Sequence, residues 1–499
     1  MKDMKSNDAN PTWFGHPRGL SVLFFTEMWE RFSYYGMRAL LVLFMVDALE
    51  TGGMGMDEKS AGAIYGLYTA FVYLVALPGG WVADRLLGAQ RSVWIGGLVI
   101  AAGHFILAIP STTSFYLGLI FVVVGTGFLK PNISAIVGQL YPEGGARRDA
   151  GFTLFYMGIN LGAFIGPLIC SYLGERVNWH AGFAAAGVGM VAGVLQYRLS
   201  IRHLGEAGRD PHVDDAVRNS GKADPAWRIF WGGFGLIAVV VALCLSGIVP
   251  INPVVLAKNT TYVIVGLAVV FFLSVFLFGK LNSDEKQRVR VIVILFVASA
   301  VFWSGFEQAG SSLNLFADRH TDRDWFGFEI PAGWFQSLPP FFIIVLAPVF
   351  ASIWVGLAKR LLEPSMPAKF AIGLLFLGLG FFVMVGAAKL VTAGNSAAPY
   401  WLILTYLLHT MGELCVSPVG LSSVTKLAPK RFGSQMMGIW FLATALGNLI
   451  AGLMAGRFNP ESLDDMPGLF LQIVLIAVGS GLLMLVFTKR IKRLMGKIE

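Results

Sequence analysis

The sequence predicts an all-α protein that crosses a membrane many times. Hydrophobic residues make up 56% of the 499 positions and charged residues only 14%, whereas soluble domains carry about 25% charged residues. Long apolar stretches recur along the whole chain and alternate with short polar connections. Lys and Arg residues gather in every second connection, as they do in the cytoplasmic loops of membrane proteins.

The spans can be placed one after another, because a helix needs about 20 apolar residues to cross the hydrocarbon core of a bilayer. Fourteen segments meet this requirement, at residues 19–47, 59–84, 91–110, 114–140, 150–174, 180–200, 228–250, 260–280, 289–317, 332–361, 369–391, 399–427, 433–456 and 467–489.

The charges of the connections predict the orientation of the chain. Basic residues follow the even-numbered spans, among them Arg85, Arg91, Arg147, Arg148, Lys359, Arg360, Lys430, Arg431, Arg490 and Arg493. The connections at 47–58 and 318–329 are neutral or acidic. The positive-inside rule therefore places both termini in the cytoplasm, as an even number of spans requires. It also explains the net charge of +8 without nucleic acid as a partner.

The longest polar insertion separates two groups of six spans. It covers residues 201–227 and is followed by two segments, 228–250 and 260–280, that carry almost no polar groups and are expected to face lipid. We therefore predict an N-terminal six-helix bundle at 1–200, a cytoplasmic linker with an extra transmembrane hairpin at 201–284, and a C-terminal six-helix bundle at 285–499. Two six-helix bundles around a site near the midplane are the plan of the major facilitator fold.

The first span carries charges that a lipid-facing helix would not tolerate. Glu27, Glu30, Arg31 and Arg38 lie inside 19–47, and each charge near a bilayer centre costs about 2.5–3.5 kcal/mol on insertion scales. At about 100° per residue, Glu27, Arg31 and Arg38 fall close to one line along the helix. The face is either a functional site or a ladder of ion pairs that joins two helices.

Further charges lie in three other spans. Lys130 lies deep in the fourth span, Glu307 in the ninth and Glu413 in the twelfth. Positive groups thus come from the first half of the chain, at Arg31 and Lys130, and carboxylates come from the second half. This arrangement suits a zwitterion whose carboxylate points to the first half and whose ammonium points to the second.

Several motifs in order resemble the proton-dependent oligopeptide transporters, also called the peptide transporter family. TEMWERFSYYG at 26–36 matches the signature ExxERFxYYG of that family, and GGWVADRLLGAQRSV at 79–93 is similar to its loop motif. GFLKPN, FTLFYMGINLGAF and GELCVSPVGLSSVTKLAP are similar to motifs of its fourth, fifth and tenth spans. The resemblance covers nearly the whole chain, and the extra hairpin is similar to that of bacterial members.

The resemblance implies a role for each polar position. Arg31 and Lys130, assisted by Tyr35, would bind the carboxylate of a peptide. Asn160 and Glu413 would bind its amino terminus. The remaining roles are proton coupling by Glu27, Glu30 and Glu307, an extracellular gating pair Arg38–Glu307, a cytoplasmic gating pair Lys130–Glu413, and side-chain pockets shaped by Tyr73, Trp303 and Trp440. Pro339 departs from the family, which commonly has Asn there, so one contact to the amino terminus is missing.

The resemblance implies a proton-coupled symporter that imports di- and tripeptides by alternating access. The alternative is a proton-coupled transporter on the same scaffold for another small anion or amphiphile, such as nitrate or histidine. The sequence contains no HExxH, GxSxG or phosphate-loop motif, which argues against an enzyme. We expect no catalytic residue, metal or cofactor. We expect a multi-pass protein of the bacterial inner (plasma) membrane that works as a monomer on peptides and protons within the lipid bilayer.

Overall fold

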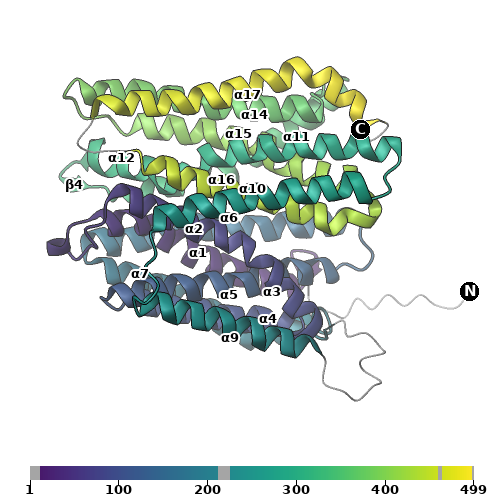
Figure 1. The fold of residues 1–499 in the computed structure, drawn as a ribbon, viewed down its shortest axis with the longest axis horizontal. Helices are drawn as coiled ribbons and strands as arrows, with labels where there is room; N and C mark the ends of the chain where they lie inside the picture. The colour runs from purple at the N-terminus through teal and green to yellow at the C-terminus, as the bar shows by residue number, and fades with distance from the viewer. Residues whose placement is uncertain (1–11, 212–224, 459–462, 497–499) are drawn as a thin grey trace, which may run out of the picture. The chain divides into compact units, whose positions relative to one another are not determined.

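The computed structural model describes residues 12–211, 225–458 and 463–496, and these residues form mainly long helices (Figure 1). The long helices are α1 Gly19–Val46, α2 Glu58–Leu74, α4 Ala89–Leu107, α5 Thr112–Gln139, α6 Gly145–Arg176, α7 Trp179–Ser200, α9 Pro225–Leu245, α10 Pro253–Phe278, α11 Ser283–Phe306, α13 Leu338–Lys359, α14 Met366–Thr392, α15 Tyr400–Leu427, α16 Gly433–Ala455 and α17 Met466–Met495.

Short elements join or interrupt these helices. Two are the short helices α3 Ala76–Val82 and α12 Ser312–His320, and one is a π-helical turn, η2 Ala83–Leu87. The 3₁₀ turns are η1 Leu49–Thr51, η3 Ile201–Leu204, η4 Glu307–Gly310, η5 Ala332–Ser337, η6 Lys430–Phe432 and η7 Leu463–Asp465. Two small antiparallel hairpins pair β1 Thr12–Trp13 with β2 His16–Pro17, and β3 Asp324–Trp325 with β4 Phe328–Glu329.

Local sequence explains where helices begin. At α2 the carboxylate of Asp57 accepts hydrogen bonds from the backbone N–H and the hydroxyl of Ser60, at 2.9 and 2.8 Å. At α11 the side chain of Asn282 accepts a bond from the N–H of Glu285, whose carboxylate accepts one from the N–H of Asn282. Such a reciprocal capping box satisfies N–H groups that the first helical turn leaves unpaired.

The described residues divide into two compact units. The first unit contains the described parts of Met1–Met37, Val75–Cys170 and His180–Pro250. The second contains the described parts of Arg38–Leu74, Ser171–Trp179 and Ile251–Glu499. The division passes through α1 and α6, so it follows packing and not the chain order. The predicted limits at 1–200, 201–284 and 285–499 stay a prediction.

The first unit has an apolar core shared by α1, α4, α5, α6 and α7. Its fully buried members include Leu20, Leu23, Ile133, Val137, Met190 and Tyr197. Glycines let α3 and α5 approach closely, because a Cβ on Gly79 would collide with the carbonyl of Gly127. This close packing fixes the segment of α5 that carries Lys130.

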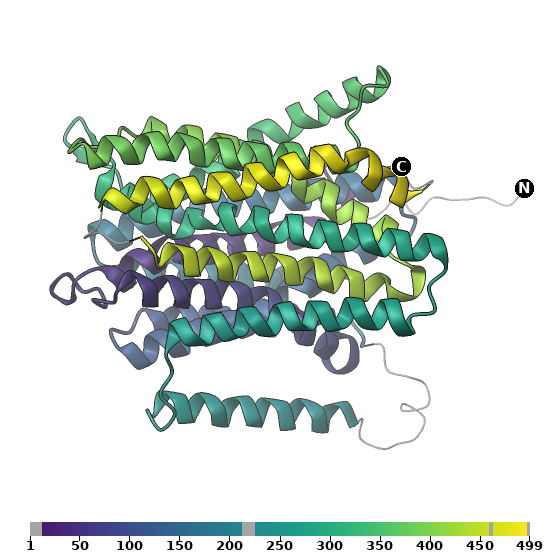
Figure 2. The same ribbon diagram turned by 45° about the horizontal axis from the view of Figure 1, so that its top comes forward.

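In the second unit α14 packs between α15 and α17 (Figure 1). The helix α16 runs beside α2, α10 and α11 (Figure 2). Glycine faces allow the contact of α2 with α16, since a Cβ on Gly62 would collide with the carbonyl of Gly452 and one on Gly452 with the carbonyl of Gly62. The backbones of the two helices therefore touch.

The observed helices match the predicted spans with two refinements. Thirteen helices among the described residues are long and apolar enough to cross a membrane. The 28-residue helix α1 is not among them because of its charges. The expected spans 59–84 and 289–317 are not continuous helices. The first breaks after Leu74, and the second turns into the 3₁₀ turn η4 at Glu307.

The two segments expected to face lipid differ from each other. In α9 the single buried residue is Ala226, which packs against Val82 and Leu86 of the first unit. In α10 a stripe is buried, which includes Ile264, Ala268 and Phe272, and the helix packs on α2 and α16 of the second unit. Most residues of both helices are exposed, and α10 differs from α9 by its buried stripe.

Candidate functional site

The first unit buries two carboxylates and a guanidinium on one helix. Glu27, Glu30 and Arg31 of α1 are at most 5% exposed. The Nε of Arg31 donates to Oε1 of Glu27 at 2.8 Å and lies 3.1 Å from Oε2 of Glu30. The pair Glu27–Arg31 has the i,i+4 spacing that brings side chains together on a helix. In the described part of the chain, Oε2 of Glu27 has no hydrogen-bond partner, so the cluster retains acceptor capacity.

Three further predicted residues belong to the first unit. The half-buried Lys130 of α5 interacts electrostatically with Glu30, and Tyr35 does so with Arg31. Asn160 of α6 is buried, and its amide donates to the carbonyl of Tyr156 at 2.9 Å. Its side-chain oxygen is an acceptor that this bond does not use. The structure therefore brings Lys130 and Tyr35 to the charged cluster on α1.

The second unit contains a buried ion pair. The Nη2 of Arg38 lies 2.7 Å from Oε2 of Glu307, and both residues are at most 5% exposed. The Nε of Arg38 donates to the hydroxyl of Tyr65 at 2.7 Å, and the guanidinium carbon lies 5.7 Å from the centroid of that ring. A charged pair away from water is stable only when its remaining hydrogen-bonding groups also find partners, and Tyr65 supplies one of them.

Glu307 sits where the helix of the ninth span is interrupted. The turn η4 follows α11 at Glu307 and ends at Gly310. A Cβ on Gly310 would collide with the hydroxyl of Tyr65 and lie 3.0 Å from Nε of Arg38. Asn314 in α12 then donates to the carbonyl of Ala39 at 2.8 Å. The break therefore brings this backbone close enough to α1 and α2 for the Arg38–Glu307 pair to form.

The remaining predicted residues of the second unit lie on three helices and on α2. Glu413 of α15 is buried, interacts electrostatically with Glu307, and has an Oε2 without a hydrogen-bond partner among the described residues. Trp303 of α11 and Tyr73 of α2 are half-buried. Trp440 of α16 is 6% exposed and packs edge-on against Phe370. Lys130 and Glu413 belong to different units, so their pairing stays a prediction.

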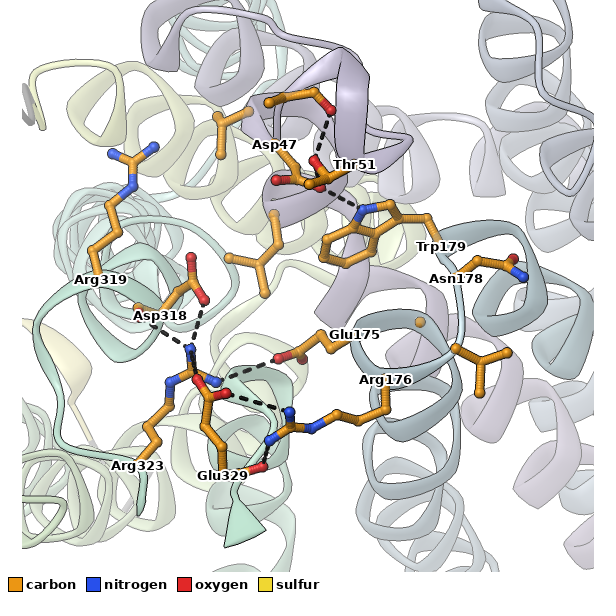
Figure 3. A pocket seen from close by; sticks show the side chains of 15 residues that line it. Asp47, Thr51, Glu175, Arg176, Asn178, Trp179, Asp318, Arg319, Arg323 and Glu329 are labelled. Carbon is orange, nitrogen blue, oxygen red and sulfur yellow. Dashed lines mark hydrogen bonds and ion pairs between the residues drawn. The ribbon is translucent and has the colours of Figure 1, made fainter. Parts of the chain in front are cut away.

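A polar cavity of about 650 Å³ lies in the same unit, lined by the ends of α1, α6 and α12 and by residues that follow these helices (Figure 3). Arg323 is its central cation. Its guanidinium lies 3.0 Å from a carboxylate oxygen of Asp318, 3.0 Å from one of Glu329 and 3.7 Å from one of Glu175. One arginine thus gathers three carboxylates from two parts of the chain.

Hydrogen bonds as well as ion pairs connect the end of α6 to this network. The two carboxylate oxygens of Glu175 accept the backbone N–H groups of Ala332 and Gly333, at 2.6 and 2.9 Å. Arg176 forms an ion pair with Glu329 at 3.3 Å and also donates to its carbonyl. Glu175 therefore caps the start of η5, which leads into α13.

The sequence did not single out the residues of this network, nor Tyr65. Tyr65 is one of several tyrosines in apolar spans, and nothing in its spacing marks it as the partner of Arg38. Glu175 and Arg323 could have been suspected, because each is a charge at the edge of an apolar segment. The pairing of these two residues could not have been predicted, since Glu175 and Arg323 lie far apart in the sequence.

Comparison with known proteins connects this arrangement to a family. Residues 90–465 match the POT family. The chain belongs to this family. This POT family chain is 43% identical over its full length to the peptide transporter YePEPT of Yersinia enterocolitica, of which it covers 99%. It is 38% identical to a di-/tripeptide transporter of Lactococcus lactis, with 99% of each chain covered.

Solved structures agree with the sequence relatives. The POT family chain superposes on a peptide transporter POT in complex with sulfate with a TM-score of 0.89, at 42% identity and 97% coverage of each chain. A POT family transporter in complex with 5-aminolevulinic acid gives a TM-score of 0.85 at 36% identity, with 96% of this chain and 98% of that chain covered.

These comparisons confirm several predictions. The family resemblance and the all-α membrane fold of the major facilitator type are confirmed. Family membership also confirms a multi-pass transporter and not an enzyme. The roles assigned to individual residues are not tested by the comparisons and stay predictions.

Proposed function

We propose that this chain is a proton-coupled symporter that imports di- and tripeptides by alternating access. Its relatives named as di-/tripeptide transporters match nearly the whole chain. The observation that carries the proposal is the buried group of Glu27, Glu30 and Arg31 with Lys130 beside it. We place the protein in the bacterial inner membrane with both termini in the cytoplasm, working as a monomer.

Arg31 and Lys130 bind the peptide carboxylate in this proposal, with Tyr35 assisting. A guanidinium holds a carboxylate through two parallel N–H bonds, and an ammonium adds a second, compact charge. Asn160 and Glu413 bind the peptide amino group, because both have acceptor oxygens, and Oε2 of Glu413 has no hydrogen-bond partner among the described residues. Tyr73, Trp303 and Trp440 form apolar walls for side chains, which suits a carrier that holds backbone ends and accepts many peptides.

Charge balance links the proton to the peptide. Glu27 and Glu30 against Arg31 and Lys130 make a set of two negative and two positive charges. A peptide carboxylate that enters this set adds a negative charge that is costly in a site removed from water. A proton on Glu27 or Glu30 removes that excess. Carboxylate binding and protonation therefore favour each other, as reciprocal linkage requires.

The ion pair Arg38–Glu307 serves as the outer gate in this proposal. Protonation of Glu307 removes the Coulomb attraction, which is strong at a distance of 2.7 Å away from water. The closed state of the gate then loses stability relative to the open state, and the population of the open state rises. The pairing of Lys130 with Glu413 closes the cytoplasmic side in the same proposal.

Uptake by reconstituted vesicles tests the proposal. An acidic outside and a neutral inside should drive labelled dialanine above its outside concentration, and a proton ionophore should abolish the accumulation. Unlabelled di- and tripeptides should compete, whereas free histidine and nitrate should not. Accumulation that nitrate or histidine blocks would instead indicate the alternative substrate on the same scaffold.

A further inference from the structure

A second polar cavity, of about 510 Å³, lies in the first unit where α4 begins and α7 ends. None of its residues takes part in the proposed peptide or proton site. The residues that give it its chemistry are Arg91 and Trp94 of α4, Arg198 of α7, Arg202 of η3, and Arg209 in the following loop. The four arginines are solvent-exposed, and an anion among them would further reduce their mutual repulsion.

The cavity is built on a fixed loop. The side-chain amide of Gln90 donates to the carbonyls of Gly205 and Ala207, at 3.0 and 2.8 Å. The backbone N–H of Gln90 donates to the carbonyl of Gly208 at 2.7 Å. The N–H of Gly208 in turn donates to the side chain of Gln139 at 2.6 Å. These bonds hold the 205–209 loop against α4 and keep its arginine beside the others.

Carboxylates among the described residues neutralise only part of the positive charge of this cavity. Arg209 forms an ion pair with Glu206 at 2.7 Å. Within the described residues, Arg91, Arg198 and Arg202 have no carboxylate within ion-pair distance. The guanidinium carbon of Arg198 lies over the ring of Trp94, 5.8 Å from its centroid.

An apolar surface continues from the cavity along the same two helices. Trp94 and Leu98 are 37% and 43% exposed and lie one turn apart on α4. Leu195 and Leu199, one turn apart on α7, are 57% and 78% exposed, and Leu195 lies one turn before Arg198. In a membrane protein such a face meets acyl chains. The cavity therefore offers an anion site at the end of a surface for lipid tails.

We propose that this cavity binds the phosphodiester headgroup of an anionic phospholipid, such as phosphatidylglycerol, with its acyl chains along Leu98, Leu195 and Leu199. Guanidinium groups bind phosphate oxygens in a bidentate manner, and basic pockets beside membrane helices are known to hold anionic headgroups. The adjoining apolar face favours a lipid over a free phosphate. A bound lipid would brace α4, α7 and the 205–209 loop as one body.

Quenching of Trp94 by brominated lipids tests this assignment. The full-length protein is placed in nanodiscs that contain the same mole fraction of dibrominated phosphatidylglycerol or dibrominated phosphatidylcholine. The difference between the parent and Trp94→Phe isolates the signal of Trp94, and Phe keeps a ring beneath Arg198. We expect stronger quenching by phosphatidylglycerol, and a loss of that preference on the order of tenfold in Arg91→Gln/Arg202→Gln.

A matched variant separates local binding from net charge. Arg490→Gln/Arg493→Gln removes two exposed arginines at the end of α17, where Arg490 stacks on Phe487 at 5.6 Å, and it should keep the preference. Equal quenching of Trp94 by the two lipids would overturn the proposal. So would displacement of phosphatidylglycerol by inorganic phosphate at equal concentration, which would indicate a site for small anions.

Discussion

At the scale of single residues, replacement of Arg31 is the most direct test of the proposed peptide site. Its Nε contacts two carboxylates, and its terminal N–H groups can donate to a third partner. A guanidinium can bind two neighbours and a substrate at once because its five N–H donors form a planar fork, whereas an ammonium is a single point charge.

We therefore predict that Arg31→Lys lowers peptide affinity although it keeps the charge. The expected loss is about 10- to 100-fold, since a hydrogen bond to a charged group contributes about 1.5–3 kcal/mol. Competition against labelled dialanine in vesicles measures it. A C-terminally amidated dipeptide should compete poorly in the parent protein, and equal competition by amidated and free dipeptides would show that Arg31 does not bind the carboxylate.

Glu307→Gln separates proton coupling from peptide binding. The amide has nearly the same shape and its oxygen can contact Arg38, but it cannot carry a proton in and release it. We expect loss of proton-driven accumulation, while counterflow of labelled against unlabelled peptide continues. Counterflow needs binding and alternation without net proton movement. Accumulation equal to that of the parent would place the coupling proton elsewhere, with Glu27 or Glu30 as the next residues to replace.

The sequence predicts contacts between neighbouring residues of this site, but not contacts between residues that lie far apart in the chain. The contact of Glu27 with Arg31 follows from helical spacing, so it could be predicted. The contact of Arg38 with Glu307 came only from the family resemblance, because nothing local relates the two. Neither helical spacing nor the family resemblance predicted the third partner, Tyr65. Its hydroxyl reaches Arg38 because α2 lies beside α1 and the backbone at Gly310 comes close.

At the scale of elements, the packing of α2 on α16 depends on glycine. We predict that Gly452→Val lowers the thermal unfolding temperature, because its Cβ would meet the carbonyl of Gly62 and the backbone of Gly66. Overpacking of this kind costs about 1–3 kcal/mol. Gly479→Val in α17 is the control, since a Cβ there meets nothing within 4 Å. Equal shifts in both variants would mean that the close approach of α2 and α16 contributes nothing specific.

The cap that Glu175 provides for η5 gives a second test at this scale. Glu175→Gln keeps one acceptor oxygen but turns an N–H₂ group toward the other backbone N–H, and it removes a partner of Arg323. We expect amide exchange in residues 328–338 to become about tenfold faster, since an unsatisfied buried donor costs about 1–3 kcal/mol. Hydrogen exchange with mass spectrometry measures this.

Glu329→Gln is the matched control for that experiment. Glu329 also contacts Arg323, but its side chain is 52% exposed and it caps no backbone group. Its replacement should leave exchange of Ala332 and Gly333 nearly unchanged, because exposed ion pairs contribute about 0–1 kcal/mol. Equal acceleration in both variants would mean that charge alone, and not the cap, orders this segment.

The elements also show why helix breaks escape prediction from sequence. Apolar content located some spans to within one or two residues, for example 19–47 against Gly19–Val46, but it placed the start of α10 seven residues too late, at 260 against Pro253. The sequence of the ninth span does not predict its break at Glu307, because none of the residues Phe306, Glu307 and Gln308 is a proline. Side-chain contacts made by Arg38, Tyr65 and Asn314 stabilise the turn there, and such contacts depend on the tertiary structure.

At the scale of the whole molecule, each compact unit contains part of the predicted site. The first holds Glu27, Glu30, Arg31 and Lys130, and the second holds Glu307 and Glu413. In the proposed function the peptide carboxylate binds Arg31 and the peptide amino group binds Glu413, so a substrate without one end should lose only the contacts of that end.

Blocking the peptide amino group tests that division. N-acetylated dialanine keeps the carboxylate that Arg31 binds but offers no ammonium to Glu413. We expect Glu413→Gln to weaken binding of dialanine and to leave binding of the acetylated peptide nearly unchanged. Binding of each by the purified protein can be compared directly. An equal loss for the two peptides would assign Glu413 to gating alone.

The coupling of a proton to a zwitterion also predicts how the whole carrier responds to voltage. Dialanine has no net charge, so its import with one proton moves one positive charge inward. An inside-negative potential of 100 mV contributes about 2.3 kcal/mol to that movement, which corresponds to a ratio of about 50 in accumulation. Vesicles with a potassium diffusion potential and no pH gradient measure this dependence. Alanylglutamate carries one negative charge, so its import with one proton should be independent of voltage, and alanyllysine should respond twice as steeply as dialanine. Equal accumulation of dialanine with and without the potential would rule out net proton symport. Equal slopes for all three peptides would mean that the number of protons changes with the side-chain charge, with two protons for alanylglutamate and none for alanyllysine.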